Sequence, residues 1–284
     1  MTERSAAVLL TYRYLRLATV VVVVMLAVAL GAQYAAAGCW QTSISAYYFT
    51  SAHSAFVAAL CAIGTCLIVY QGNTDTEDVV LNFAGYLAFV VAFVPTSREP
   101  ICAGPGLPAA YDIAPGVRTT VLALVVTGVV AEALRIRFTR GTGRPPLSRW
   151  ARLATVVGWT VIAVGIIAYA VAPQRFEDYG HTTAAVTMFV GIIVVIVLNA
   201  LSAKAADQPA GYVAAYQGIA AVMAVTLVAI VAIRLALPQW VHVVIWVEVV
   251  LIAAFAAFWL VQTKELWEVI DRREVSPTPD PTGR

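Results

Sequence analysis

Long apolar stretches alternate with short polar ones along the chain, and eight of these stretches have the length of a membrane span. They cover residues 17–37, 53–70, 78–95, 118–136, 153–172, 181–202, 212–237 and 240–261. A helix needs about 20 apolar residues to cross a hydrocarbon layer of about 30 Å. Helices are expected because a bilayer offers no partner for unpaired backbone groups, and the strand alternation of a barrel is absent from the sequence. The pattern predicts an all-α, polytopic membrane bundle of eight transmembrane helices within residues 1–263.

Composition supports the same class of protein. Hydrophobic residues make up 61% of the chain and charged residues 12%, whereas soluble domains contain about half and about a quarter. The net charge of +2 is too small to indicate nucleic acid. The sequence contains no Walker, Rossmann or haem motif. We therefore expect membrane lipids as partners, and no nucleic acid or nucleotide.

The distribution of basic residues predicts the orientation. Cytoplasmic flanks of membrane helices carry an excess of Lys and Arg, and a cytoplasmic N-terminus places fourteen of the 18 basic residues inside. These are Arg4, Arg13, Arg16, Arg135, Arg137, Arg140, Arg144, Arg149, Arg152, Lys204, Lys264, Arg272, Arg273 and Arg284. With eight spans, both termini are then cytoplasmic. Residues 264–284 are expected to form a short amphipathic helix on the inner surface, followed by a disordered, Pro-rich tail.

The predicted topology sorts the four cysteines. Cys61 and Cys66 lie within the second span and are interpreted as packing residues. Cys39 and Cys102 fall in the first and second outer loops, on the oxidising side, where a disulfide between them is expected. Cys39 also ends a loose lipoprotein-like signal (AAGC), so lipidation of Cys39 is the alternative. An apolar run of about 21 residues is longer than a typical signal core and favours an uncleaved span.

Glu248 is the ionisable residue that cannot escape the hydrocarbon. It follows Trp240 by eight residues, which places it about 12 Å along the last span at 1.5 Å per residue. Its neighbours in the helix are apolar, so it is expected to face other spans, with Arg234 as a possible partner. Two interpretations stay open: a structural hydrogen bond to a neighbouring helix, or a role in binding a ligand, proton or metal.

Three histidines provide a second candidate site. His53, His181 and His242 lie at or near the outer starts of the second, sixth and eighth spans, and thus at similar depth. Three His ligands with water in the fourth position are typical of catalytic zinc. The alternative is three separate interfacial histidines, because no two of them have the close spacing of a metal motif such as HExxH. No cofactor is expected unless this zinc site forms.

Residues 41–54 (QTSISAYYFTSAHS) form the most polar uncharged stretch of the chain. Tyr47 and Tyr48 anchor this segment at the interface in the simplest interpretation, since Tyr is enriched there. In the alternative, the segment forms the lip of a pocket for a lipid headgroup.

Three stretches resemble a family of uncharacterised bacterial multi-span membrane proteins. They are residues 43–50 (SISAYYFT), residues 94–96 (VPT), and Glu248 followed by residues 258–266 (FWLVQTKEL). His53 and Ser54 stand where that family often has an Arg-Asp pair. The resemblance implies a helical bundle in the bacterial cytoplasmic (plasma) membrane and implies no activity.

The leading functional hypothesis is a non-enzymatic plasma-membrane protein. It binds a lipid or small amphipathic ligand in a polar cavity of the outer leaflet near Tyr47, His181 and Glu248. One alternative is a membrane-embedded, metal-dependent hydrolase with His53, His181 and His242 as ligands and Glu248 as general base. Another is a proton-coupled transporter with Glu248 as carrier.

Overall fold

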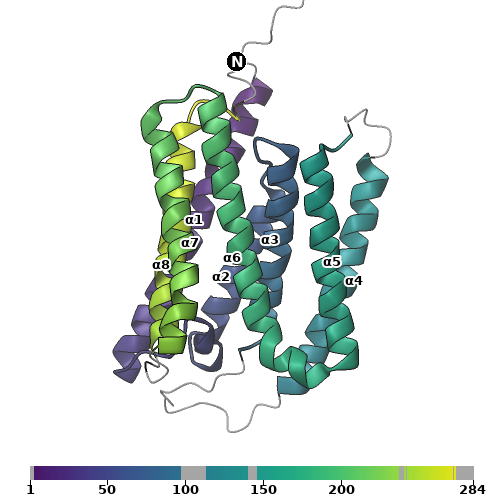
Figure 1. Ribbon diagram of the computed structural model, residues 1–284, viewed down its shortest axis with the longest axis vertical. Coiled ribbons are helices and arrows are strands. Elements are labelled where there is room, and N and C mark those ends of the chain that lie inside the picture. Colours follow the sequence, from purple (N-terminus) through teal and green to yellow (C-terminus); the bar gives the residue numbers. More distant parts are fainter. Residues whose placement is uncertain are drawn as a thin grey trace, which may run out of the picture.

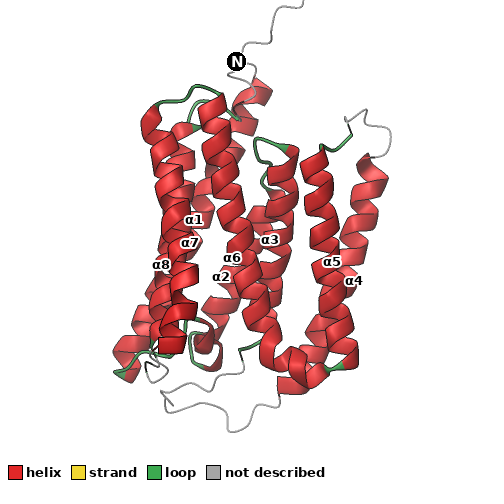
Figure 2. Ribbon diagram, viewed as in Figure 1, coloured by secondary structure: helices red, strands yellow, loops and turns green. Residues whose placement is uncertain are grey.

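The computed structural model describes residues 3–96, 113–139, 146–236, 240, 242–270 and 272. It contains eight long helices and one short 3₁₀ helix, η1 (Ser45–Phe49) (Figure 1). The long helices are α1 (Glu3–Ala37), α2 (His53–Val69), α3 (Asp75–Phe93), α4 (Ile113–Thr139), α5 (Arg149–Val171), α6 (Pro173–Ala205), α7 (Ala210–Ala236) and α8 (Val243–Glu265). Every regular element in the described ranges is helical (Figure 2). The all-α prediction is confirmed, with one long helix at each predicted span.

Seven of these helices are long and apolar enough to cross a membrane. The remaining one, α2, is apolar but has 17 residues. At 1.5 Å per residue it measures about 26 Å, a little less than a typical hydrocarbon layer of about 30 Å. The structure therefore supports a multi-pass helical membrane protein with at least seven candidate spans in its described part.

The helices form a bundle in which α4 and α5 stand to one side of α3 (Figure 1). Most of the buried core lies among α1, α2, α3, α6, α7 and α8. By contrast, α4 and α5 expose large apolar side chains, such as Leu122 at 64% and Val156 at 63%. Such exposure suits contact with lipid, because a bilayer does not penalise apolar surface. We call the end at which α1 begins the N-terminal end of the bundle and the opposite one the far end.

α2 and α3 pack with their backbones almost in contact. A Cβ atom on Gly64 would lie 2.8 Å from the carbonyl oxygen of Gly85, and one on Gly85 would lie 2.6 Å from that of Gly64. Small residues at such crossings are the usual means of bringing membrane helices close together. This contact fixes α3, whose first turn carries Glu77, next to the end of α2.

α3 and α5 also begin at defined caps. The Thr74 side chain accepts a hydrogen bond from the Glu77 backbone N–H (3.1 Å), and Ser148 accepts one from Ala151 (3.2 Å). These bonds satisfy donors that a helix start leaves unpaired. The Ser148 N–H in turn donates to Asp75 (2.6 Å), which joins the starts of the two helices at the N-terminal end.

The segment after α8 differs from the sequence prediction. Residues 266–270 are not helical, so the predicted amphipathic helix is wrong in this part. The chain instead folds across the N-terminal end of the bundle, where Leu266 and Arg272 are 1% and 3% exposed. The predicted tail, residues 273–284, lies outside the described residues.

Candidate functional site

At the far end, the loop between α1 and α2 covers the start of α8. The Ile245 N–H, in the first turn of α8, donates to the Thr42 carbonyl of this loop (3.1 Å). One turn deeper, the Glu248 carboxylate accepts hydrogen bonds from the Ile44 N–H (2.5 Å) and the Ser45 hydroxyl (3.2 Å). Ile44 is the N-cap of η1. Glu248 therefore holds the start of η1, in the connection between α1 and α2, whereas the sequence predicted that it would face other spans.

A cavity of about 50 Å³ lies next to Glu248. Glu248 and Ser45 supply its polar lining, and the rest is apolar, from Ile44 and from α1, α2, α3, α6 and α8. Among these apolar residues are Leu26, Phe56, Ile63, Met188 and Phe255. A space of this size holds a water molecule or two. A larger guest needs movement of the lining side chains.

The three histidines do not form a metal centre. His53 Nδ1 lies 2.6 Å from the Tyr48 carbonyl oxygen, His181 Nδ1 lies 2.5 Å from that of Val94, and His242 Nε2 lies 3.2 Å from that of Trp40. Within the described ranges, no three His, Cys, Asp or Glu side chains are grouped closely enough to hold a metal ion. A similar depth along different helices does not bring the side chains to a common point.

The other predicted site residues are scattered. Tyr47 is fully buried and Tyr48 is partly exposed, with its ring 4.4 Å from that of His53 and edge-on to it. Neither tyrosine lines the cavity, and nor does His181. Burial raises the pKa of the Tyr47 hydroxyl, an effect partly opposed by a hydrogen bond with the Gln41 backbone.

Two further predictions involve residues outside the described part. The Arg234 side chain is one of these, so its pairing with Glu248 stays a prediction. Cys102 is another, so the Cys39–Cys102 disulfide also stays a prediction. Cys61 and Cys66, interpreted as packing residues, are free thiols in α2.

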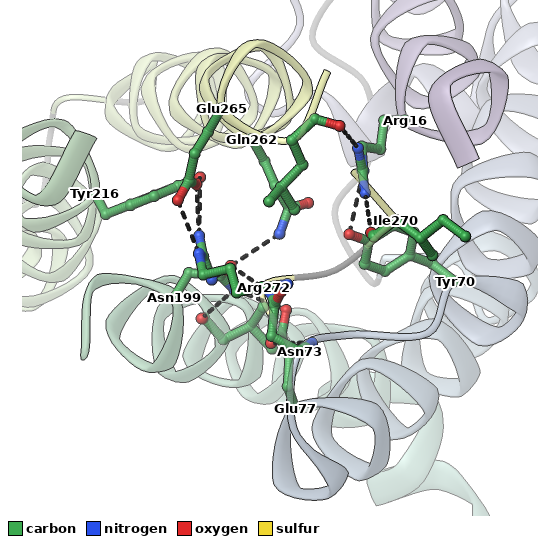
Figure 3. Close-up of polar contacts among 12 residues, drawn as sticks. Arg16, Tyr70, Asn73, Glu77, Asn199, Tyr216, Gln262, Glu265, Ile270 and Arg272 are labelled. Atoms are coloured by element: carbon green, nitrogen blue, oxygen red, sulfur yellow. Dashed lines mark hydrogen bonds and ion pairs between the residues drawn. The ribbon is translucent and has the colours of Figure 1, made fainter. Parts of the chain in front are cut away.

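A second polar assembly, at the N-terminal end, was not predicted from the sequence (Figure 3). We call it the Arg272 cluster; its members are Asn73, Glu77, Asn199, Tyr216, Gln262, Glu265 and Arg272. Arg272 donates from Nε and Nη2 to the two oxygens of Glu265 at 2.8 and 2.5 Å. Its Nη1 donates to Asn199 Oδ1 (3.1 Å), and its backbone N–H donates to Asn73 Oδ1 (3.1 Å). Tyr216 completes this arrangement by donating its hydroxyl to Glu265.

Asn199, midway across the cluster, connects Arg272 to Glu77. Its side-chain NH₂ donates to Glu77 (2.7 Å). Its carbonyl oxygen accepts from the side chains of Asn73 (3.2 Å), Gln262 (2.9 Å) and Arg272 (3.1 Å). Glu77 and Asn199 are both fully buried. Buried polar groups are tolerated when the surrounding hydrogen bonds satisfy them, as they do for Glu77 and Asn199.

Arg16 holds the segment after α8 in place. Its guanidinium donates to the carbonyls of Leu266 (3.1 Å) and Ile270 (2.9 Å) and to the Tyr70 hydroxyl (3.2 Å). Burial lowers the pKa of Arg272, but the hydrogen bonds to Glu265 outweigh it and raise the pKa overall. Arg272 therefore stays charged within the cluster.

These residues carried little signal in the sequence. Arg16 and Arg272 were interpreted as part of the cytoplasmic charge bias, and the partners of Arg272 lie as many as 199 positions away. The available clue was Asn199, a strongly polar residue inside an apolar span. Together, the fold and its apolar helices define a multi-pass helical membrane protein. No family model, curated protein or solved structure matches this chain.

Proposed function

We propose that the chain crosses the bacterial plasma membrane eight times with both termini in the cytoplasm. The support is the antiparallel order of the eight helices, together with the basic residues at the N-terminal end of the bundle. Arg13, Arg149 and Lys204 all lie at this end, on α1, α5 and α6. α2 is about 4 Å shorter than the hydrocarbon layer. Local thinning of the bilayer would bring both membrane surfaces to the ends of this helix.

Reporter fusions at the connections test this topology. A cytoplasm-active reporter placed after Asp207, between α6 and α7, is expected to be active. The same reporter placed after Ser51, between α1 and α2, is expected to be inactive. The reverse pattern would overturn the orientation, and equal activity at Ser51 and after Gly72 would show that α2 does not cross.

We further propose that the protein binds a small amphipathic ligand with a single chain at the cavity beside Glu248. The observation that carries this proposal is a cavity that is apolar except at one end. The apolar lining favours a hydrocarbon chain, because burial is worth about 25 cal/mol per Å² of apolar surface. At the polar end, Glu248 and Ser45 suit a hydroxyl or amine headgroup that donates a hydrogen bond.

The small volume of the cavity limits the ligand. At about 50 Å³ it excludes a bulky headgroup and a two-chain lipid unless the helices separate. Several lining side chains, including Met188, have free rotatable bonds, and Met adapts readily to irregular guests. A flexible single chain is therefore the guest that needs the least rearrangement.

Photo-crosslinking with a long-chain alcohol that carries a diazirine tests this proposal. We expect competable labelling of peptides around Phe56–Ile63 and Met188–Ile192, which line the cavity. Ala185→Leu adds bulk to the lining and is expected to abolish this labelling. Ala221→Leu, which adds the same bulk to an exposed position on α7, is the matched control and is expected to leave it unchanged. Equal labelling of both variants would contradict the proposal.

The alternative functions receive less support from the geometry. The hydrolase requires the three histidines to share a metal, but each contacts a different carbonyl. Proton-coupled transport requires a polar path from Glu248 to Asn199. Between Glu248 and Gln262, the buried residues of α8 are hydrophobic, so α8 does not supply this polar path. They are Leu251, Phe255, Phe258 and Trp259.

A further inference from the structure

The Arg272 cluster joins a cation from one segment to acceptors from several helices. Glu265 and Gln262 belong to α8, Asn199 to α6, Tyr216 to α7 and Glu77 to α3, whereas Arg272 belongs to the segment that crosses the end of the bundle. Figure 3 shows the guanidinium pointing into the space between these helices. We propose that this space is a binding site for a guanidinium compound, and that the Arg272 side chain is its internal occupant in this structure.

The charges of the helices require a cation at this position. Glu265 has a side chain that is 0% exposed, and Glu77 is equally buried. Glu77 is bonded by the neutral groups of Asn73 and Asn199, whereas Glu265 forms its ion pair with Arg272. If Arg272 leaves, a buried carboxylate loses its counter-charge, which is strongly unfavourable. An incoming cation restores the balance.

The geometry selects a guanidinium over a simple amine. Nε and Nη2 of Arg272 donate to the two oxygens of Glu265. Nη1, the third nitrogen of the guanidinium, donates to Asn199 Oδ1. A planar fork makes these bonds together, whereas an ammonium group is a compact point charge and cannot. A second copy of this fork on a small molecule would find the same acceptors in place.

An unused acceptor within the cluster points to a ligand with one more donor. Gln262 is 0% exposed, and its Nε2 donates to Asn199, but its Oε1 has no hydrogen-bond partner. An unmet buried carbonyl is costly, so such groups are rare. Figure 3 shows the Gln262 side chain between the side chains of Arg272 and Arg16. A guanidinium compound that also carries an amine or hydroxyl donor could satisfy this oxygen, which Arg272 does not.

The segment that delivers Arg272 is held by Arg272 itself and also by contacts outside the site. Arg16 binds its Leu266 and Ile270 carbonyls, and Arg13 binds its Trp267 carbonyl and lies 4.5 Å from the Trp267 ring. Residues 266–270 are not helical, and Trp267 is 46% exposed. Withdrawal of Arg272 therefore does not require any transmembrane helix to unfold.

Chemical rescue of Arg272→Ala tests this proposal directly. The variant is expected to melt at a lower temperature than the full-length wild type. Millimolar ethylguanidinium is expected to raise its Tm by several degrees in a saturable manner. Ethylammonium and NaCl at equal ionic strength are the matched solutes and are expected to give no saturable rise. The double variant Arg272→Ala/Glu265→Gln is expected to lose the response, because the bidentate acceptor is gone.

A rise of the same size in the double variant, or no saturable rise in Arg272→Ala, would overturn the proposal. If Arg272→Ala does not fold, hydrogen exchange of the wild type replaces it. Ethylguanidinium is then expected to speed exchange of amides 266–270 several-fold by competing with Arg272, and ethylammonium is not. Unchanged exchange with both solutes would reject the site. These results are independent of ligand binding beside Glu248, which lies at the other end of α8.

Discussion

The two ends of the bundle each hold a carboxylate from α8, but with different partners and different burial. Glu248 and Glu265 are separated by 17 positions, or about 26 Å along the helix. Glu248 is bonded by a backbone N–H and a hydroxyl and borders a cavity. Glu265 is bonded by a guanidinium and a phenol and is covered by the chain that follows it. On the same helix, Glu248 therefore has free space beside it, whereas Glu265 is enclosed by its partners.

The free-energy cost of holding a carboxylate inside the bundle depends on which groups bind it and on how freely those groups can move. Neutral donors at the far end belong to a loop and leave space beside the carboxylate. At the N-terminal end, groups from several parts of the chain meet. The removal of one of them leaves several others without a hydrogen-bond partner. Substitutions at the two ends should therefore differ in size, and this contrast can be tested.

Asn199→Leu is expected to give the largest loss of stability. It removes the acceptor of three donors and the amide that binds Glu77. The free energy of unfolding is expected to fall by about 3–5 kcal/mol, as when a buried charge loses its partner. Titration with SDS in mixed micelles measures this change. Gln217→Leu, at an exposed position of α7, is the matched control and is expected to change little. Similar losses for both would contradict the role of the cluster.

Gly72→Ala is expected to give an intermediate loss at the same end. A Cβ atom at position 72 would lie 2.5 Å from Glu77 Cδ. Because Glu77 is held by Asn73 and Asn199, it cannot move away freely, and crowding of this kind costs about 1–3 kcal/mol. The same SDS titration applies. Gly218→Ala, where a Cβ atom meets nothing within 4 Å, provides the control. A neutral Gly72→Ala would mean that Glu77 is not held as described.

Glu248→Gln is expected to cost less, about 1 kcal/mol, because the amide keeps one acceptor oxygen for the Ile44 N–H. The effect should be local. Hydrogen exchange is expected to accelerate in residues 41–49 and to stay constant in residues 266–270. Faster exchange at both ends would show that the two assemblies are coupled.

Arg13→Ala is expected to give the smallest change, about 0.5–1 kcal/mol, because its cation–π contact with Trp267 and its hydrogen bond to the Trp267 carbonyl are both accessible to solvent. Thermal unfolding in detergent measures it. Arg16→Ala provides the comparison, because Arg16 is fully buried and binds two carbonyls of the same segment. A loss for Arg13→Ala equal to that for Arg16→Ala would contradict the assigned difference in burial.

Sequence reasoning found the helices because apolar length alone marks them, and it found Glu248 because depth follows from helical rise. The direction in which a side chain points around its helix was not predictable in this way. His53, His181 and His242 lie at similar depth on different elements, and the sequence does not say which way each one faces. Arg16 and Arg272 were hidden by their plausible role in topology, since a basic residue at a cytoplasmic helix end needs no further explanation.

Hydrogen exchange of the wild type and Arg272→Gln in lipid nanodiscs tests most directly whether the two ends are separate assemblies. The wild type is expected to protect residues 266–270. In Arg272→Gln these amides are expected to exchange at least about tenfold faster, the equivalent of about 1.4 kcal/mol of opening free energy. Residues 41–49 are expected to exchange at the same rate in both proteins. Unchanged protection of residues 266–270, or equally faster exchange of residues 41–49, would show that the two ends are not separate assemblies.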